Sequence, residues 1–326
     1  MSGSAAFTHL AAARERFLEA DFDAARRLVA QYRAELVPDD LPREDRRAAA
    51  QPVVSVIVVS WGGGEAMLAC LDSILAQDDG ALELILIDNG DNESVREALA
   101  ERALLHVRPP FNVLPSAARN LGVHFARGRY VVFIDDDALI MPGYLASVRL
   151  AFESFEFAAV RGRVIPFGET SNNRFVGHYD IGPFPVPAVL STEGNMAMRA
   201  DVFRELGGFD PLMFGSEGAE LSWRCQQRFP EMDIYYWPGM LIRHDYSEGP
   251  RLEAKAERQA LARRYCEWLS PEVNELMRDY GRWYQRRPGG ALRYDSRGFG
   301  DKLQAFAQVW WMRARRAMRG RRPPQG

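Results

Sequence analysis

The chain has 326 residues, of which 47% are hydrophobic and 26% charged, proportions typical of a soluble globular protein with a substantial core. Its 41 Lys and Arg against 44 Asp and Glu give a formal charge of -3, so there is no overall positive field to attract nucleic acid. Three dispersed cysteines (Cys70, Cys225 and Cys266) argue against a disulfide framework or a zinc cluster and suit a reducing compartment.

Two further observations favour a cytoplasmic location. Glu15, Glu19 and Asp21 interrupt the region where a secretion signal would need an apolar run. No uncharged apolar stretch is long enough to span a bilayer.

Residues 5–36 have helical periodicity and read as two short helices joined near Asp21. They look like one tetratricopeptide-type hairpin, but no second copy follows, so a repeat array is not expected. We expect a helical N-terminal extension over residues 1–37, packed on the main domain or on a second subunit of a homodimer. A polar, proline-containing linker should follow over residues 38–52.

Strands and helices alternate through the predicted main domain, residues 53–250. Such alternation indicates a parallel, doubly wound α/β sheet, whose ligands bind beyond the carboxyl ends of the strands. A loop-rich stretch is predicted over residues 166–187, and a helical region with a basic tail over residues 251–326. Strands are predicted over residues 53–59, 82–87, 130–134, 234–237 and 241–244, and helices over residues 65–75, 94–102, 116–126, 143–155, 200–206 and 217–229.

An acidic triplet directly follows the strand predicted over residues 130–134. Asp135 and Asp137 are two apart in an extended segment, so their side chains should point the same way. Paired carboxylates suit Mg²⁺ or Mn²⁺, and such an ion neutralises charge on a diphosphate leaving group. A solvated turn is the alternative for three aspartates taken alone.

Six motifs in order make residues 53–244 resemble the family 2 glycosyltransferases. The resemblance implies the GT-A nucleotide-sugar fold, an α/β fold with a mostly parallel, doubly wound sheet flanked by helices, here with helical extensions at both ends. The motifs are VVSVIVVSW, LELILIDNG, SAARNLGVHFARGRYVVFIDDDA, EGNMAMRADVFRELGGFD, FGSEGAELSWR and IRHDYS.

The resemblance also implies a metal site and the cofactor Mg²⁺ or Mn²⁺. Asp135 and Asp137 match the metal-binding DxD motif, and His244 matches a histidine that completes the metal site in some members. Without the resemblance, a single histidine after a strand is more often a capped loop residue.

Five residues match positions that bind the nucleotide-sugar donor. Asp88 matches the aspartate that hydrogen-bonds the nucleobase, a contact consistent with uridine or thymidine donors. Ser60 and Glu65 belong to the turn beside the base and ribose, and Asp136 lies close to the donor. Arg119 could contact phosphate or ribose, or could form a helix salt bridge.

The catalytic base is where the sequence departs from the family. Gly218 stands where the usual catalytic aspartate is expected. Ser216 is a plausible N-cap that places Glu217 in a first helical turn, where the helix dipole favours a carboxylate. Glu217 is therefore the predicted base, whereas Glu220, four residues before Arg224, has the spacing of a helix ion pair. The departure also leaves open a degenerate, inactive site.

Other implications of the resemblance are an inverting mechanism and a floor for donor sugar and acceptor at residues 194–196 and 207–210. Small residues there let the backbone approach a ligand closely, although ordinary turns would use them too. Leu114 stands where the family often has glycine, so altered loop packing is expected.

The C-terminal tail places Trp310 and Trp311 before a cluster of arginines between Arg313 and Arg322. This arrangement suits peripheral contact with an anionic membrane, at the inner face, and would fit a lipid-linked acceptor. The alternative is a helix that packs its tryptophans on the domain. A nucleic-acid partner is not expected, because the patch is short and the body acidic.

The sequence therefore predicts an inverting transfer of a sugar from a UDP- or dTDP-type donor to an acceptor hydroxyl, in polysaccharide, glycolipid or other glycoconjugate synthesis. A non-catalytic GT-A-like scaffold is the alternative. A nucleotidyltransferase lacks support, since no basic Gly-rich triphosphate loop is present. A dinucleotide-binding Rossmann enzyme is disfavoured because the glycines at 62–64 do not form GxGxxG, with Met67 at the last position.

Overall fold

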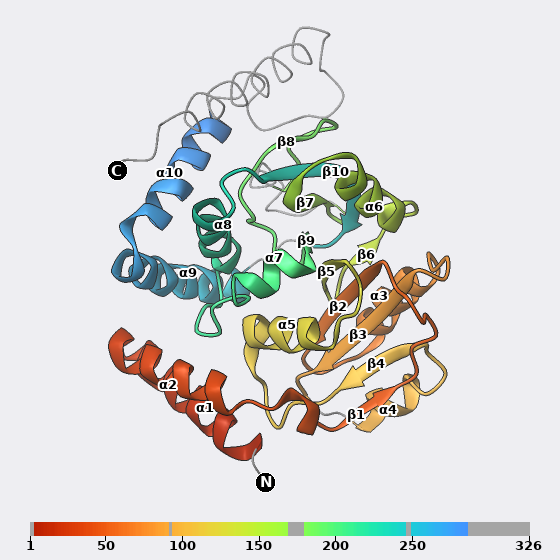
Figure 1. Ribbon diagram of the computed structural model, residues 1–326, viewed down its shortest axis with the longest axis horizontal. Helices are drawn as coiled ribbons and strands as arrows, with labels where there is room; N and C mark the ends of the chain where they lie inside the picture. The colour runs from red at the N-terminus through yellow and green to blue at the C-terminus, as the bar shows by residue number, and fades with distance from the viewer. Residues whose placement is uncertain (1–2, 91–92, 169–178, 246–248, 286–326) are drawn as a thin grey trace, which may run out of the picture.

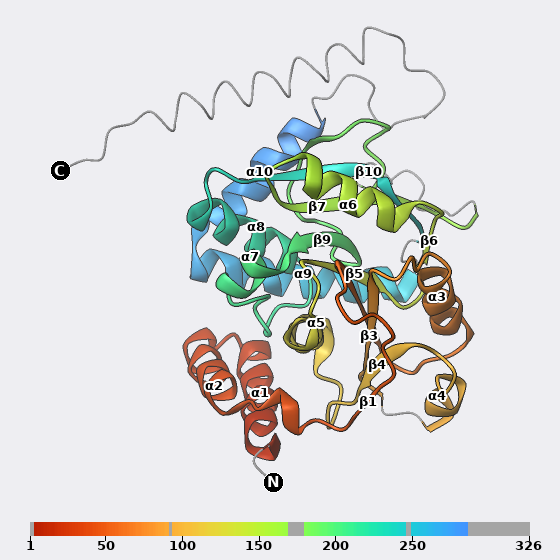
Figure 2. The same cartoon turned by 45° about the vertical axis from the view of Figure 1, so that its right-hand side comes forward.

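The computed structural model describes residues 3–90, 93–168, 179–245 and 249–285, and within them the chain forms a ten-stranded mixed sheet with helices on both faces (Figures 1 and 2). The strand order is β1-β4-β3-β2-β5-β9-β7-β10-β6, with β8 paired to β10. The longest pairings are parallel, as the alternation of strands and helices predicted.

The first half of the sheet is a parallel array in the order β4-β3-β2-β5. Its strands are rich in Val, Ile and Leu because helices cover both faces. The elements are β2 (Val54–Ser60), α3 (Glu65–Leu75), β3 (Leu82–Asp88), α4 (Glu93–Ala98), β4 (Leu104–Val107), α5 (Leu114–Phe125) and β5 (Tyr130–Asp135).

The second half begins with β9, which lies antiparallel between β5 and β7. β10 then pairs parallel to β7 as a single strand with a register shift between Tyr236 and Leu241, where two strands were predicted. The elements are β6 (Leu139–Ile140), α6 (Tyr144–Ser154), β7 (Phe157–Ile165), β8 (Val186–Pro187), β9 (Asn195–Arg199), α7 (Ala200–Glu205), α8 (Glu217–Arg228) and β10 (Asp233–Arg243).

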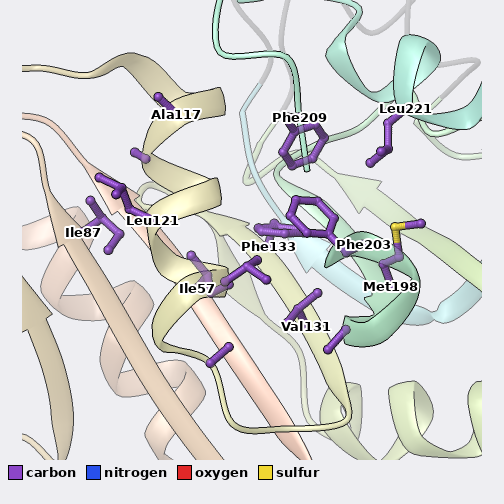
Figure 3. Close-up of a cluster of buried hydrophobic side chains, with 14 of the residues drawn as sticks. Ile57, Ile87, Ala117, Leu121, Val131, Phe133, Met198, Phe203, Phe209 and Leu221 are labelled. Carbon is purple, nitrogen blue, oxygen red and sulfur yellow. The ribbon is translucent and has the colours of Figure 1, made fainter. Parts of the chain in front are cut away.

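The core has a layer on each face of the sheet. One layer joins the sheet to α3 and α6, and the other joins it to α5, α7 and α8. Figure 3 shows the second layer, in which Phe133 of β5 meets Phe203 and Phe209 at ring-centroid separations of 5.4 Å. Ile57 packs in the same layer, so closely against α5 that a Cβ at Gly122 would lie 2.4 Å from its side chain.

The N-terminal helices are α1 (Gly3–Leu18) and α2 (Phe22–Glu35), and the Asp21 side chain caps α2 by accepting a hydrogen bond from the backbone N–H of Ala24. They lie beside α5 and α9 (Gly249–Leu269) in both views (Figures 1 and 2). Phe17 and Phe22 each contact the ring of Tyr265 on α9, at centroid separations of 5.2 Å. The hairpin is therefore packed on the body of the same chain.

The stretch predicted as a linker, residues 38–52, contains ordered elements. A 3₁₀ turn, η1 (Pro38–Asp40), leads into β1 (Arg43–Asp45), which pairs antiparallel with β4 at the edge of the sheet. β1 has too few apolar residues to be recognised as a strand.

At the other end, α10 (Pro271–Gln285) follows α9. The tail with Trp310, Trp311 and the arginine cluster lies outside the described residues. Among the helices that the structure describes, none combines the length and apolar character needed to cross a membrane.

Candidate active site

Polar side chains gather where three neighbouring parallel strands end. In the sheet register Ser60 of β2 is opposite Asp88 of β3, and Val59 is opposite Asp135 of β5. Ser60, Asp88 and Asp135 therefore lie along one edge of the sheet, at the carboxyl ends of its strands, where ligands bind in folds of this class.

Each aspartate of the acidic triplet has a different partner. Burial raises the pKa of Asp136 to about 6, with the charges of Asp137 and Asp135 adding to the rise and a hydrogen bond from Ser60 opposing it. The three contacts are Asp135 Oδ1 with Arg119 Nη2 at 2.9 Å, Asp136 Oδ2 with Ser60 Oγ at 2.5 Å, and Asp137 Oδ1 with His244 Nε2 at 2.9 Å.

The predicted metal ligands are thus brought together in part. His244 follows β10 and reaches Asp137 across the end of the sheet, whereas Asp135 is paired with Arg119. The residues the structure describes contain no group of three or more His, Cys, Asp and Glu side chains placed to hold a metal ion. Asp137 and His244 would supply one oxygen and one nitrogen to a divalent cation, a donor set that such a cation accepts.

Arg119 links the triplet to the start of α8. It lies on α5, and its guanidinium donates to Asp135 Oδ1 and, at 3.2 Å, to Glu217 Oε1. The guanidinium also lies over the ring of Phe209, 5.9 Å from its centroid. These contacts fix a buried positive charge between two carboxylates at the carboxyl edge of the sheet.

Glu217 is the first residue of α8, as predicted, but the predicted cap is wrong in one respect. Ser216 adopts a left-handed φ of 64° and its side chain makes no capping hydrogen bond. Instead Glu217 Oε2 accepts a hydrogen bond from the backbone N–H of Gly215 at 2.6 Å. Burial, followed by the charge of Glu193, raises the pKa of Glu217 to about 7, against the lowering effect of Arg119.

Glu220 is paired as the sequence spacing indicated. Both of its carboxylate oxygens accept hydrogen bonds from Arg224 at 2.6 Å, and its side chain is 2% exposed. The bidentate pair leaves Glu220 in a structural role inside α8.

Glu193 is a carboxylate at this site to which the sequence assigned no role. Its Oε1 accepts a hydrogen bond from the backbone N–H of Gly218 at 2.9 Å. The next residue, Gly194, lies against Asp135, because a Cβ there would fall 1.9 Å from Asp135 Oδ2. The one sequence signal that could have pointed to Glu193 was Gly218, which stands where the family usually has an aspartate.

Asp88, predicted from the sequence to bind the nucleobase, is buried. Asp88 Oδ1 accepts a hydrogen bond from the backbone N–H of Gly90 at 3.0 Å, and His106 Nε2 lies 3.1 Å from Asp88 Oδ2. His106, on β4, was not predicted as part of the site. Glu65, by contrast, is an exposed residue at the start of α3.

Residues 207–210, predicted as part of the floor for donor sugar and acceptor, have defined contacts in the structure. Gly207 and Gly208 adopt φ angles of 75° and 74°, which favour glycine. Asp210, two residues on, is buried and binds Arg26 of α2 at 2.9 Å and the Tyr265 hydroxyl at 2.7 Å. Asp210 therefore anchors the N-terminal hairpin.

Comparison with known proteins found matches to the central part of the chain. Residues 55–207 match the family model described as glycosyl transferase family 2. The pre-mycofactocin glycosyltransferase of Mycobacterium tuberculosis is 26% identical over 183 residues, which are 51% of this chain and 38% of that protein. The chain thus matches well under two thirds of this curated relative.

Two solved structures share the fold. The Staphylococcus aureus protein TarS, residues 1–349, in complex with UDP-GlcNAc has a TM-score of 0.52 at 13% identity, covering 78% of this chain and 80% of that one. GalNAc-T7 with UDP, GalNAc and Mn²⁺ has a TM-score of 0.51 at 15% identity, covering 74% and 57%. At these identities the likeness concerns the fold.

Proposed function

Because residues 55–207 belong to glycosyltransferase family 2 and the sheet has the GT-A fold, we propose that this chain transfers a sugar from a nucleotide-diphosphate donor to an acceptor hydroxyl. The observation that carries the proposal is the line of contacts from Ser60 and Asp136, through Asp135 and Arg119, to Glu217. This line joins the donor-binding positions to a carboxylate of raised pKa at the carboxyl edge of the sheet.

The donor is proposed to lie along the ends of β2, β3 and β5. Asp88 would accept a hydrogen bond from the base N–H of a uridine or thymidine, since each carboxylate oxygen can accept more than one hydrogen bond. Ser60 and Glu65 would border the ribose, and Asp136 the sugar phosphate. Arg119, a buried cation at this edge, would attract the diphosphate.

The side chains of Asp137 and His244 fit a divalent cation, either Mg²⁺ or Mn²⁺. Their ligand atoms already lie 2.9 Å apart and both side chains are partly exposed. Asp135, the first aspartate of the predicted metal-binding motif, would join them. When bound, the ion would offset negative charge on the diphosphate.

The transfer is proposed to invert the anomeric centre. An acceptor hydroxyl attacks the anomeric carbon while the bond to the diphosphate breaks, and a carboxylate of the protein receives the hydroxyl proton. Glu217 is the base predicted from the sequence; burial raises its pKa to about 7, but its oxygens are engaged by Arg119 and by the Gly215 N–H.

The acceptor is proposed to be a saccharide or a lipid-linked glycan, in polysaccharide, glycolipid or other glycoconjugate synthesis at the cytoplasmic face of a membrane. The basic tail would supply peripheral membrane contact.

A non-catalytic scaffold of the same fold remains the competing function, because Gly218 replaces the usual aspartate.

Donor binding and donor hydrolysis test the proposal together. Calorimetry with UDP- and dTDP-sugars, beginning with UDP-GlcNAc and Mn²⁺, should show metal-dependent binding, and water should slowly replace the acceptor, which releases UDP. Asp137→Ala should abolish metal-dependent binding and leave the melting temperature nearly unchanged, since Asp137 is 58% exposed.

The matched control is Glu231→Ala. Glu231 is an exposed acid before the amino end of β10, the end opposite His244, so its removal should not alter donor affinity. Binding without hydrolysis on every donor would favour the scaffold, and unchanged affinity in Asp137→Ala would contradict the metal site.

A further inference from the structure

The position of the missing catalytic aspartate is closed to any side chain. A Cβ on Gly218 would lie 2.5 Å from the carbonyl oxygen of Leu190 and 2.8 Å from Glu193 Oε1. Real Cβ atoms do not approach a backbone oxygen so closely, so the glycine is required by the packing of the segment before β9 against α8. That segment brings its own carboxylate, Glu193, to the place that a side chain at 218 would occupy.

Glu193 has a usable oxygen in this position. Its Oε1 is held by the Gly218 N–H at the amino end of α8, where the helix dipole favours a negative charge. Its Oε2 has no hydrogen-bond partner among the described residues, and the side chain is partly exposed. Gly194 places the same segment against Asp135 at the end of β5.

The two glutamates of α8 do not offer such an oxygen. Glu217 is 5% exposed and its oxygens are engaged by Arg119 and by the Gly215 N–H. Glu220 is held by Arg224 through both oxygens. Of the three glutamates, only Glu193 combines a partly exposed side chain with an oxygen available to an incoming hydroxyl.

We infer that Glu193 is the catalytic base. Its carboxylate takes the place of the aspartate that the family usually has at the position of Gly218. The inference rests on the proposed transferase activity. The acceptor O–H bond breaks and its proton passes to Glu193 Oε2. The acceptor oxygen forms a bond to the anomeric carbon, and the bond from that carbon to the diphosphate breaks, so that its electron pair leaves with the nucleotide. The Glu193 proton then returns to water.

Glu217 becomes a positioning residue in this arrangement. Its carboxylate holds Arg119, which in turn holds Asp135 at the donor edge. Loss of its charge should therefore weaken donor binding and turnover together, whereas loss of the base should lower turnover alone.

The test compares Glu193→Gln with Glu217→Gln, using UDP release from UDP-GlcNAc or the best-bound donor with Mn²⁺ and with water as acceptor. In Glu193→Gln the amide keeps an oxygen that can accept from the Gly218 N–H, but it cannot take a proton. We expect kcat to fall by about 10²–10⁴-fold, the usual contribution of a general base. Donor affinity by calorimetry should stay within about twofold. Glu193→Asp should recover part of the activity.

The reverse pattern would overturn the inference. If Glu217→Gln loses turnover with donor affinity intact while Glu193→Gln hydrolyses like the unaltered chain, the base is Glu217. Equal loss of affinity and turnover in Glu193→Gln would also overturn it, since that is the signature of a positioning role. An unaltered chain that binds and hydrolyses no donor would instead remove the transferase activity itself, a distinct outcome.

Discussion

At the scale of single residues, Leu114 carries backbone strain at the start of α5. Its φ of 61° lies in the left-handed region, where a side chain costs about 1–2 kcal/mol relative to glycine. Leu114→Gly should therefore raise the free energy of unfolding in urea by about 1 kcal/mol. Leu114→Ala is the matched control, because it shortens the side chain and keeps the Cβ. Equal stability of the two variants would refute the strain.

A second residue-scale prediction concerns Glu217 and pH. Its folded-state pKa of about 7 lies above the ordinary value of 4.5, so the folded chain binds this proton more tightly than the unfolded chain. The resulting stability is complete below pH 4.5 and is lost as the pH rises through 7. Glu217→Gln, which stays neutral, should stabilise the fold by on the order of 2–3 kcal/mol at pH 8.

The measurement is the melting temperature of both proteins between pH 4 and pH 8, without donor or metal. At pH 4 the two should melt together, because Glu217 is then protonated. A Glu217→Gln variant that is less stable at pH 8 would show that the ion pair with Arg119 outweighs burial.

At the scale of elements, the segment before β9 sets the position of Asp135. A methyl group at Gly194 would overlap the Asp135 carboxylate, so Gly194→Ala should push that side chain from the donor edge. Metal-dependent donor affinity should fall about tenfold or more, as for the loss of one charged contact. Gly168→Ala is the control, since a Cβ there meets nothing within 4 Å. Equal affinity in both variants would contradict the crowding.

The elements also show what a sequence can and cannot reveal. The helix predicted over residues 65–75 is α3 itself, since the preceding glycines mark its start and its apolar spacing continues to Leu75. β4, a run of four residues with a single β-branched side chain, and β9, with the unbranched NMAMR, lack the run of β-branched residues that made β2 recognisable. The contacts of Asp135 with Arg119 and of Glu193 with Gly218 join residues 16 and 25 positions apart, and no periodicity encodes such pairs.

At the scale of the whole molecule, the N-terminal hairpin is part of the fold. Phe22 packs against Tyr265 and Trp268, and its side chain is buried. Phe22→Ala should lower the free energy of unfolding by about 3–5 kcal/mol, the usual effect for a core phenylalanine. Leu18, near the hairpin turn and 72% exposed, provides the control Leu18→Ala, which should be nearly neutral. Similar losses in the two variants would show that the Phe22 contacts contribute little.

The contacts of Asp210 with Arg26 and Tyr265 have a consequence for folding during synthesis. Arg26 and Tyr265 are separated by 239 positions in the chain. A ribosome will have delivered the first two helices long before their aromatic partner emerges, so the hairpin must wait with Phe17 and Phe22 uncovered. We therefore expect these contacts of Asp210 to form late in folding, and they fix the loop that leads to α8.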